Sequence, residues 1–154
     1  MIHAQEVLGP LTININSAEI FEDSMDAFRG LADPYLELLI DGELVHTTEY
    51  IKNSHDPEWG ESFTYNVLVE DLAKVVSYKV WDDDTMNAEL VGEGTSLVSE
   101  LIGDLDGDGV DVTKDLYDSA GAATGKVHFT TSFTNEKAIR DAEEAKQAEE
   151  ARVL

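Results

Sequence analysis

The sequence predicts an all-β sandwich followed by a short C-terminal helix. Short runs in which apolar and polar residues alternate recur through most of the chain, and clusters of Gly, Pro, Asn and Asp separate them. Such alternation is typical of half-buried strands, because successive side chains of a strand point to opposite faces. The alternation stops near Asn135, where residues that favour helices take over. We therefore expect a sandwich domain over residues 1–134 and an acidic, Ala/Glu-rich helical tail over residues 135–154.

Eight runs are strand candidates. Leu11–Asn16 and Ser62–Val67 alternate with a period of two, and Asp41-Gly42 after Tyr35–Ile40 is a hairpin signal. The candidates in chain order are Leu11–Asn16, Tyr35–Ile40, Val45–Tyr50, Ser62–Val67, Val75–Trp81, Leu90–Leu101, Val110–Leu116 and Lys126–Thr134. Eight short strands with regular turn signals favour a sandwich.

The tail has the pattern of a solvated helix. Asn135 is a suitable N-cap, and Ala138, Ala142 and Ala145 follow at helical spacing. A stripe of alanines buries little apolar surface, so a solvated helix is favoured over the start of a coiled coil.

Composition restricts the functional classes. The chain has 154 residues, which fits one domain with an appendage, and it has no cysteine, so disulfides and thiolate metal sites are excluded. The chain has no apolar run long enough for a membrane span. The first residues carry no secretory signal pattern, so we expect a cytoplasmic protein.

The formal net charge is −23, and residues 1–134 carry most of it, with 27 acidic and 6 basic side chains. Nucleic acid is therefore excluded as a partner, since binding its backbone needs clustered Lys and Arg. An anionic membrane should also repel the protein until cations neutralise it. Solubility, or a salt-rich habitat, is the simpler explanation of the charge and is compatible with a metal site.

Two Asp-rich clusters each lie next to a predicted strand. One runs from Asp26 to Asp33, and the other contains Asp82, Asp83 and Asp84. Alone, each cluster is explained as a turn. Carboxylates that converge from two clusters repel one another unless a cation binds them, and Ca²⁺ takes six to eight oxygen ligands from flexible loops. The two clusters together predict a calcium site.

The order of four motifs resembles the C2 (calcium- and lipid-binding) domain family. The motifs are Gly9–Ile15, Asp33–Leu36, Asp56–Phe63 and Val80–Asp84, with Gly92 shortly after the last. The resemblance covers about residues 8–134. The order of the predicted strands is similar to that of the circular variant of the family, whose first strand lies at the N-terminus (type II topology). The resemblance implies an eight-stranded antiparallel Greek-key β-sandwich with three loops at one end and calcium between the first and third loops.

Carried over by position, the resemblance implies a ligand set and a membrane-contact set. The implied calcium ligands are Asp26, Asp33, Asp82, Asp84 and Glu89. The apolar residues at the implied loop tips are Phe28, Leu31 and Met86, which suit insertion into a lipid interface; Phe28 could equally fold back to cover the sandwich end. The chain departs from the family in the length of both loops, in Glu89 where Asp is usual, and in the missing basic strand patch, where His46 to Glu49 precede a lone Lys52.

Asp104, Asp106 and Asp108 match the opening of an EF-hand loop, but the twelfth position is Asp115 and strands are predicted on both sides. A solvated turn is favoured over a second metal loop. Apart from His55-Asp56, the sequence offers no catalytic arrangement, and neither a nucleophile-elbow Ser nor a Cys accompanies that pair. We therefore expect no enzyme.

The predicted function is calcium-dependent docking to anionic phospholipid membranes, which makes the protein cytoplasmic and peripheral to the membrane when calcium rises. The alternative is a calcium-stabilised protein-interaction or structural module. Its contact surfaces, for a protein partner or for self-association, would be sheet edges or the C-terminal helix.

Overall fold

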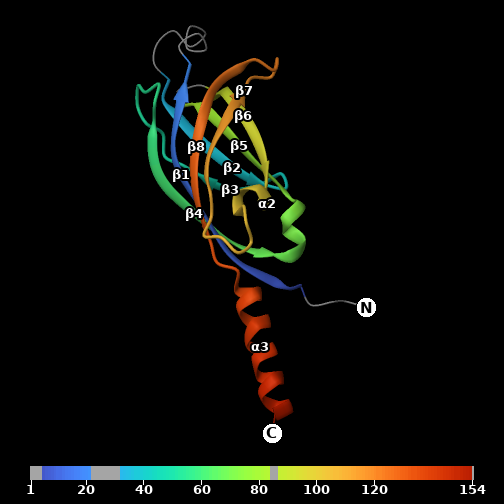
Figure 1. Cartoon of the computed structure of the whole chain (residues 1–154). Coiled ribbons are helices and arrows are strands. Elements are labelled where there is room, and N and C mark those ends of the chain that lie inside the picture. Colours follow the sequence, from blue (N-terminus) through green and yellow to red (C-terminus); the bar gives the residue numbers. More distant parts are fainter. Residues whose placement is uncertain (1–4, 22–31, 84–86, 154) are drawn as a thin grey trace.

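The computed structural model describes residues 5–21, 32–83 and 87–153 (Figure 1). Eight strands form the body, and a helix extends from one end of it (Figure 1). The strands are β1 (Val7–Ile20), β2 (Pro34–Ile40), β3 (Glu43–Thr47), β4 (Glu58–Leu68), β5 (Val75–Asp82), β6 (Glu89–Leu97), β7 (Asp111–Tyr117) and β8 (Ala123–Phe133). The short helices are η2 (Val69–Ala73) and α2 (Val98–Ile102), and the long one is α3 (Glu136–Val153).

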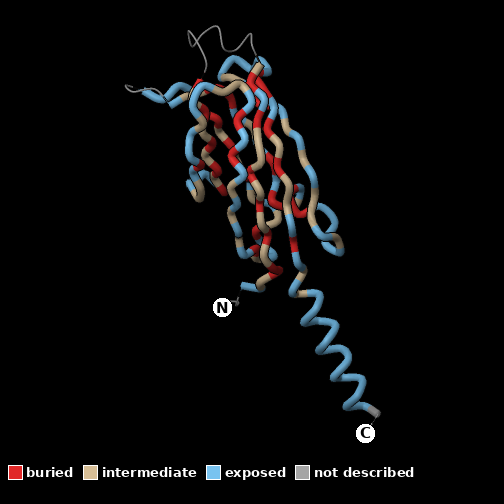
Figure 2. Tube along the Cα trace, turned by 90° about the vertical axis from the view of Figure 1, so that its left-hand side faces the viewer, coloured by how far each residue is buried: buried red, intermediate tan, exposed pale blue. Residues whose placement is uncertain are grey.

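The strands pair in the order β3-β2-β5-β6-β7-β8-β1-β4, and every pairing is antiparallel. The β6–β7 contact has a single register pair, Glu93 with Tyr117, so it divides the strands into two groups of four. The two groups enclose one core, visible as the buried positions inside the body in Figure 2. This confirms the predicted β-sandwich.

Period-two alternation places the core residues. In β2 and β5 every second side chain is buried, including Leu36, Leu38 and Val80, and the intervening side chains face outward. The expected hairpin between β2 and β3 forms at Asp41-Gly42, where φ is 52° and 82°. Positive φ at both central residues is the geometry of a type I′ turn, which the Asp-Gly pair favours.

The strand predicted over Leu90–Leu101 is too long. β6 ends at Leu97, and the following residues form α2, which buries Val98, Leu101 and Ile102. Their spacing of three and four residues is helical, and the Glu100 carboxylate accepts a hydrogen bond from the Leu97 N–H at 2.8 Å. The apolar run was compatible with a strand, but its spacing and this cap decide for a helix.

α3 forms as expected. The Asn135 side chain accepts a hydrogen bond from the N–H of Ala138 at 2.9 Å, which is an N-cap interaction. From Ala138 onward the residues of the helix with described side chains are exposed, as Figure 2 shows, and Ile139 is 59% exposed. The helix is therefore solvated over most of its length.

Candidate metal centre

Strand register gathers three of the predicted ligands at one end of the sandwich. β2 pairs with β5 so that Pro34 lies opposite Asp82, and β5 pairs with β6 so that Asp82 lies opposite Glu89. Asp33 directly precedes Pro34. The end of β5, the start of β6 and the residue before β2 therefore lie side by side, although Asp33 is 49 positions from Asp82 in the chain.

Two hydrogen bonds join the Asp33 segment to the Asp82 segment. The N–H of Asp33 donates to Oδ1 of Asp82 at 2.9 Å, and the N–H of Asp83 donates to the carbonyl oxygen of Asp33 at 3.0 Å. Asp82 therefore has a structural role as well as a charge. Asp83, which lies between the matched aspartates, takes part through its main chain.

The segment between β3 and β4 supports the same corner. The N–H of Asn53 donates to Oδ1 of Asp33 at 2.8 Å, and Asn53 itself has a positive φ of 52°. Trp59, 8% exposed, donates its indole N–H to the carbonyl oxygen of Pro34 at 3.1 Å. The sequence prediction did not include Asn53. Its tolerance of the left-handed conformation is the signal that could have identified it.

The remaining predicted residues lie outside the described ranges. These are the ligand candidates Asp26 and Asp84 and the membrane-contact candidates Phe28, Leu31 and Met86. Over residues 5–21, 32–83 and 87–153, no group of three or more His, Asp or Glu side chains is arranged to hold a metal ion. The described part thus contains three of the five predicted acidic ligands, Asp33, Asp82 and Glu89, and these three do not by themselves form such a group.

The donor chemistry of this corner suits calcium. Asp33 and Asp82 each use Oδ1 to accept a main-chain hydrogen bond, and both are only partly buried. A carboxylate has a second oxygen, Oδ2, with which it can coordinate a cation. Oxygen ligands on loops and strand ends are what calcium takes, whereas transition metals favour His or Cys.

Two carboxylates lie near the Tyr35 hydroxyl, beside this corner. Burial raises the pKa of the Tyr35 hydroxyl above its usual value, and the carboxylates of Glu37 and Asp83 raise it further. Both carboxylates therefore act on the same hydroxyl.

The Asp104–Asp108 segment lies at the other end of the sandwich. It follows α2, which begins beside the Val75 end of β5, whereas Asp82 is the last residue of β5. Asp104 closes a turn by accepting hydrogen bonds from the N–H groups of Asp106, at 3.0 Å, and Gly107, at 2.9 Å. These contacts fit the turn interpretation of the motif.

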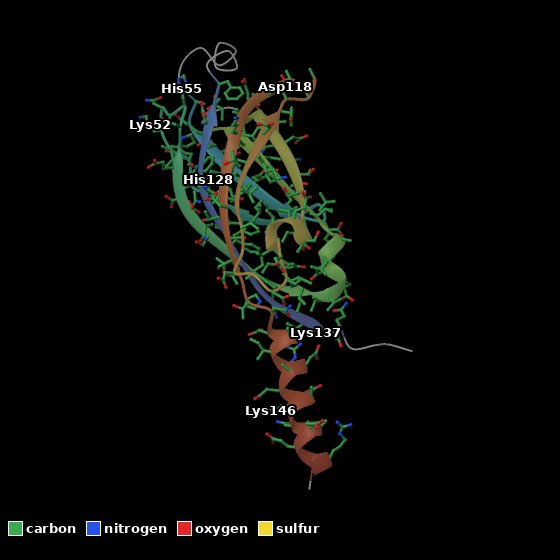
Figure 3. All side chains as sticks on the ribbon, viewed as in Figure 1. Lys52, His55, Asp118, His128, Lys137 and Lys146 are labelled. Carbon is green, nitrogen blue, oxygen red and sulfur yellow. The ribbon has the colours of Figure 1, made fainter. Side chains whose placement is uncertain are left out.

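Cationic side chains are spread over the molecule. In Figure 3, Lys52 lies at the end of the sandwich remote from α3, together with His55, whereas Lys137 and Lys146 are on the helix. His128 lies along β8, where it contacts Asp111 at 2.6 Å. The labelled cations of the body and those of the helix thus lie far apart.

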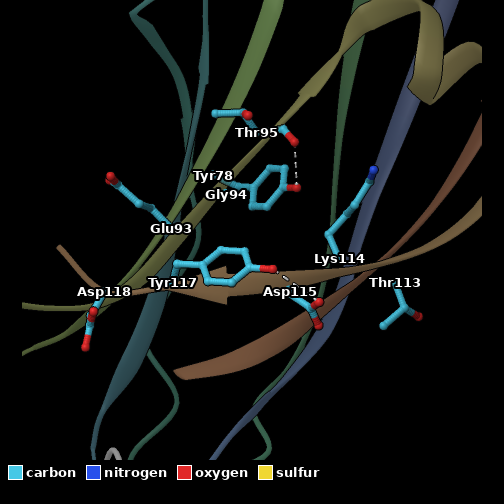
Figure 4. Close-up of a pocket in the computed structure, with 9 residues that line it drawn as sticks. All are labelled: Tyr78, Glu93, Gly94, Thr95, Thr113, Lys114, Asp115, Tyr117 and Asp118. Carbon is cyan, nitrogen blue, oxygen red and sulfur yellow. Dashed lines mark hydrogen bonds between the residues drawn. The ribbon is translucent and has the colours of Figure 1, made fainter. Parts of the chain in front are cut away.

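A pocket of about 460 Å³ lies where β6 and β7 diverge (Figure 4). Its lining includes Glu93, Lys114 and Asp115 around the rings of Tyr78 and Tyr117. The hydroxyl of Tyr78 already donates to the carbonyl oxygen of Thr95 at 3.2 Å, and Lys114 lies 3.6 Å from Glu100. These groups therefore have partners within the protein.

Among the helices that the structure describes, none is long and apolar enough to cross a membrane.

Comparison with known proteins identifies relatives of part of the chain. Mouse and human 1-phosphatidylinositol 4,5-bisphosphate phosphodiesterase eta-1 are each 34% identical over 86 residues, which is 52% of this chain and 5% of those proteins. Phospholipase D delta from Arabidopsis thaliana is 27% identical over 70 residues, 46% of this chain and 8% of that protein. The matches thus span less than a tenth of these curated relatives.

Solved structures share the fold at low sequence identity. A single C2 domain of plant Extended Synaptotagmin 1 has a TM-score of 0.66 with 17% identity, over 85% of this chain and 98% of that one. A chain of Extended-Synaptotagmin 2 that carries two C2 domains gives 0.68 with 18% identity, over 94% of this chain and 50% of that one. Human GIVD cytosolic phospholipase A2, in complex with an inhibitor and terbium chloride, gives 0.61 with 15% identity, over 84% of this chain and 18% of that one.

The family model of the C2 domain matches residues 9–113, which include β2 to β6, most of β1 and the corner formed by Asp33, Asp82 and Glu89. The chain therefore belongs to the C2 domain family.

Proposed function

We propose that this chain is a calcium-binding module that docks to anionic phospholipid membranes through its first and third loops. The observation that carries the proposal is the hydrogen-bonded joint between Asp33 and Asp82. It holds two acidic segments together in a protein with a formal net charge of −23. Without a cation, such an arrangement costs stability through like-charge repulsion.

The residues that would hold calcium are Asp26, Asp33, Asp82, Asp84 and Glu89. Asp33 and Asp82 each have a second carboxylate oxygen, Oδ2, beside the one that accepts a main-chain hydrogen bond, and Glu89 is exposed opposite Asp82. Calcium would neutralise the local charge and leave coordination positions for lipid phosphates. Phe28, Leu31 and Met86 would then enter the interface.

The names of the relatives support a lipid surface as the partner. The matched proteins include a phosphatidylinositol bisphosphate phosphodiesterase and a phospholipase D. Both names denote enzymes that act on phospholipids. The matched family is a non-catalytic module, so we infer that this chain binds a membrane and does not catalyse a reaction. The proposed location is the cytoplasm, with attachment to membranes when calcium rises.

Terbium titration of the chelator-treated protein tests the metal site. Terbium prefers oxygen ligands as calcium does, and the indole of Trp81, one residue from Asp82, can sensitise its luminescence. We expect saturable luminescence that calcium displaces and that an Asp82→Asn/Asp84→Asn variant loses. An Asp104→Asn/Asp106→Asn variant changes charge equally and should keep the signal. Loss of the signal in the second variant alone would place the cation at the other loop and overturn the proposal.

Cosedimentation with phosphatidylserine vesicles, with and without calcium, tests the docking step. We expect binding with calcium only, and loss of binding in the Asp82→Asn/Asp84→Asn variant. Saturable metal binding without vesicle binding would favour the second candidate, a calcium-stabilised protein-interaction or assembly module. Its support is the net charge of −23 and the spread of cations over the surface (Figure 3).

A further inference from the structure

An open groove of about 770 Å³ lies on the outward face of β2. Its floor comes from β2 through Tyr35 and Glu37, and one side comes from Asp83 after β5. The opposite side is the segment from Thr47 to Lys52, which includes the end of β3 and the residues after it. The groove is distinct from the pocket between β6 and β7 in Figure 4.

Hydrogen bonds within the protein hold the Thr47–Lys52 side of the groove in place. Thr48 is buried, its hydroxyl accepts the N–H of Leu36 at 2.9 Å, and its N–H donates to the Leu36 carbonyl oxygen at 2.9 Å. The N–H of Glu49 donates to Oε2 of Glu61 at 2.9 Å, while Oε1 of Glu61 lies 2.9 Å from His46. The groove is therefore preformed, which lowers the ordering cost of binding.

The charged residues of the lining are mostly acidic. Three of the eight lining residues are carboxylates, Glu37, Glu49 and Asp83, and one is a cation, Lys52. Lys79 lies opposite Glu37 in the β2–β5 pairing and opposite Glu93 in the β5–β6 pairing.

Two tyrosines complete the lining. Tyr35 is partly buried at the floor, and Tyr50 is 52% exposed in the wall. A large, half-exposed aromatic ring beside carboxylates offers a cation both a ring face and a counter-charge. Arg uses both, since its planar guanidinium stacks on aromatic rings and pairs with carboxylates.

We propose that this groove binds a basic, Arg- or Lys-bearing segment of another protein. Glu37, Glu49 and Asp83 would pair with its cations, and Tyr35 and Tyr50 would contact the side-chain stems and guanidinium planes. Charge complementarity selects this occupant, because the lining is acidic within a chain of net charge −23. An anionic lipid headgroup would meet three carboxylates here. The groove adjoins the calcium corner, because Asp83 lies between the candidate ligands Asp82 and Asp84, but none of its lining residues is a candidate ligand and the inference needs no calcium.

The test uses the full chain in chelator, at about 150 mM salt so that distant charges are screened. A fluorescently labelled peptide of alternating Arg and Gly is titrated and followed by anisotropy. We expect saturable binding that is about tenfold weaker in Glu37→Gln/Glu49→Gln, a loss of two charged contacts. Glu143→Gln/Glu144→Gln, on exposed positions of α3, changes the net charge equally and should alter the affinity by less than about twofold.

A second variant tests the aromatic contact in the groove without changing the net charge. Tyr50→Ala leaves the net charge unchanged and removes a half-exposed ring, so the fold should be kept. We expect peptide affinity to fall by roughly threefold or more, as for a lost cation–π contact. Equal weakening in the α3 variant, an unchanged affinity in Tyr50→Ala, or no saturable binding would overturn the proposal. So would chelator-resistant binding of phosphatidylinositol bisphosphate vesicles that Lys52→Ala abolishes.

Discussion

The main-chain N–H of Asp33 donates a hydrogen bond to Oδ1 of Asp82 at 2.9 Å, across 49 positions of the chain. The reciprocal bond from the N–H of Asp83 to the carbonyl oxygen of Asp33 closes the joint. Asp82 therefore joins the end of β5 to the residue before β2 through Oδ1, and Oδ2 is the atom that would coordinate calcium under the proposed function. Substitution of Asp82 should therefore reduce the stability of the fold and, under the proposed function, abolish calcium binding.

Replacing Asp82 tests the two roles separately. Asn keeps an oxygen that can accept the Asp33 N–H, and Ala does not. In chelator, we expect Asp82→Ala to have a free energy of unfolding about 1 kcal/mol below that of Asp82→Asn. Urea denaturation measures this difference. Under the proposed function, added calcium should stabilise the wild type and neither variant; equal stability of the two variants in chelator would show that the hydrogen bond contributes nothing.

Asp71 is a buried carboxylate, 1% exposed, that closes the start of η2. Burial alone would raise its pKa, but hydrogen bonds from the Leu68 N–H at 2.8 Å, Lys74 at 2.9 Å and Tyr65 outweigh burial and lower the pKa. The stability that the carboxylate adds is therefore complete above the unfolded-state pKa of about 4 and is lost as the pH falls through the lower folded-state pKa.

Asp71→Asn should lower the free energy of unfolding by about 1–3 kcal/mol at pH 7, because a neutral amide replaces the buried carboxylate and weakens the hydrogen bonds from the Leu68 N–H, Lys74 and Tyr65. Urea denaturation from about pH 2 to pH 7 measures the effect. The gap between variant and wild type should narrow below about pH 4. A difference in unfolding free energy between variant and wild type that stays constant with pH would show that the charge of Asp71 does not contribute to stability.

The ionisation of Tyr65 should make the stability of the protein depend on pH in the alkaline range. Burial first, and then the hydrogen bond to Asp71, raise the pKa of Tyr65 to about 12. The neutral phenol is therefore favoured in the folded state, so stability is complete below the unfolded-state pKa of about 10 and is lost as the pH rises to about 12. Tyr65→Phe should remove this alkaline loss, which urea denaturation at several pH values would reveal. An identical alkaline decline in the variant would assign it to other groups.

Gly92 lies where β6 approaches β7 and β8. A β-carbon at this position would overlap Oγ1 of Thr124 and lie 2.9 Å from Cβ of Leu116. Gly92→Ala should therefore destabilise the sandwich by about 1–3 kcal/mol through overpacking. Gly107→Ala is the matched control, because its nearest neighbour would lie at 3.2 Å in an exposed turn. Thermal unfolding compares the two; an equal change in Tm would contradict the packing explanation.

We propose that residues 1–134 fold without the helical tail. α3 contacts the body through the Arg140 guanidinium, 2.6 Å from the carbonyl oxygen of Val7, and through Lys137, 3.7 Å from Glu6. Exposed contacts of this kind are worth about 1 kcal/mol or less. Deleting residues 136–154 should therefore leave the near-ultraviolet circular dichroism unchanged and shift Tm by only a few degrees, about what 1 kcal/mol produces. An unfolded product would refute the division.

Local sequence patterns predicted most of the strands and helices, but the residues at which some of them begin and end differ in the structure. β1 runs over Val7–Ile20 although the clean alternation covers only Leu11–Asn16, because pairing with β4 and β8 extends it on both sides. The predicted strand over Leu90–Leu101 overran into α2, although the helical spacing of Val98, Leu101 and Ile102 and the Glu100 cap are local signals for a helix. Tertiary pairing decided the ends of β1, whereas the end of β6 follows from these local signals.

Features that depend on neighbouring residues could be predicted before the structure was known. Alternation predicted the strands, Asp41-Gly42 the hairpin, Asn135 the start of the helix, and the ordered motifs the family. The meeting of distant groups depends on the packing of the strands. The Asp33–Asp82 joint and the groove with Glu37, Glu49 and Asp83 come from strand register and from a wall held across the sheet. Register is a non-local property, since it follows from how the strands share one core, and short-range patterns carry little information about it.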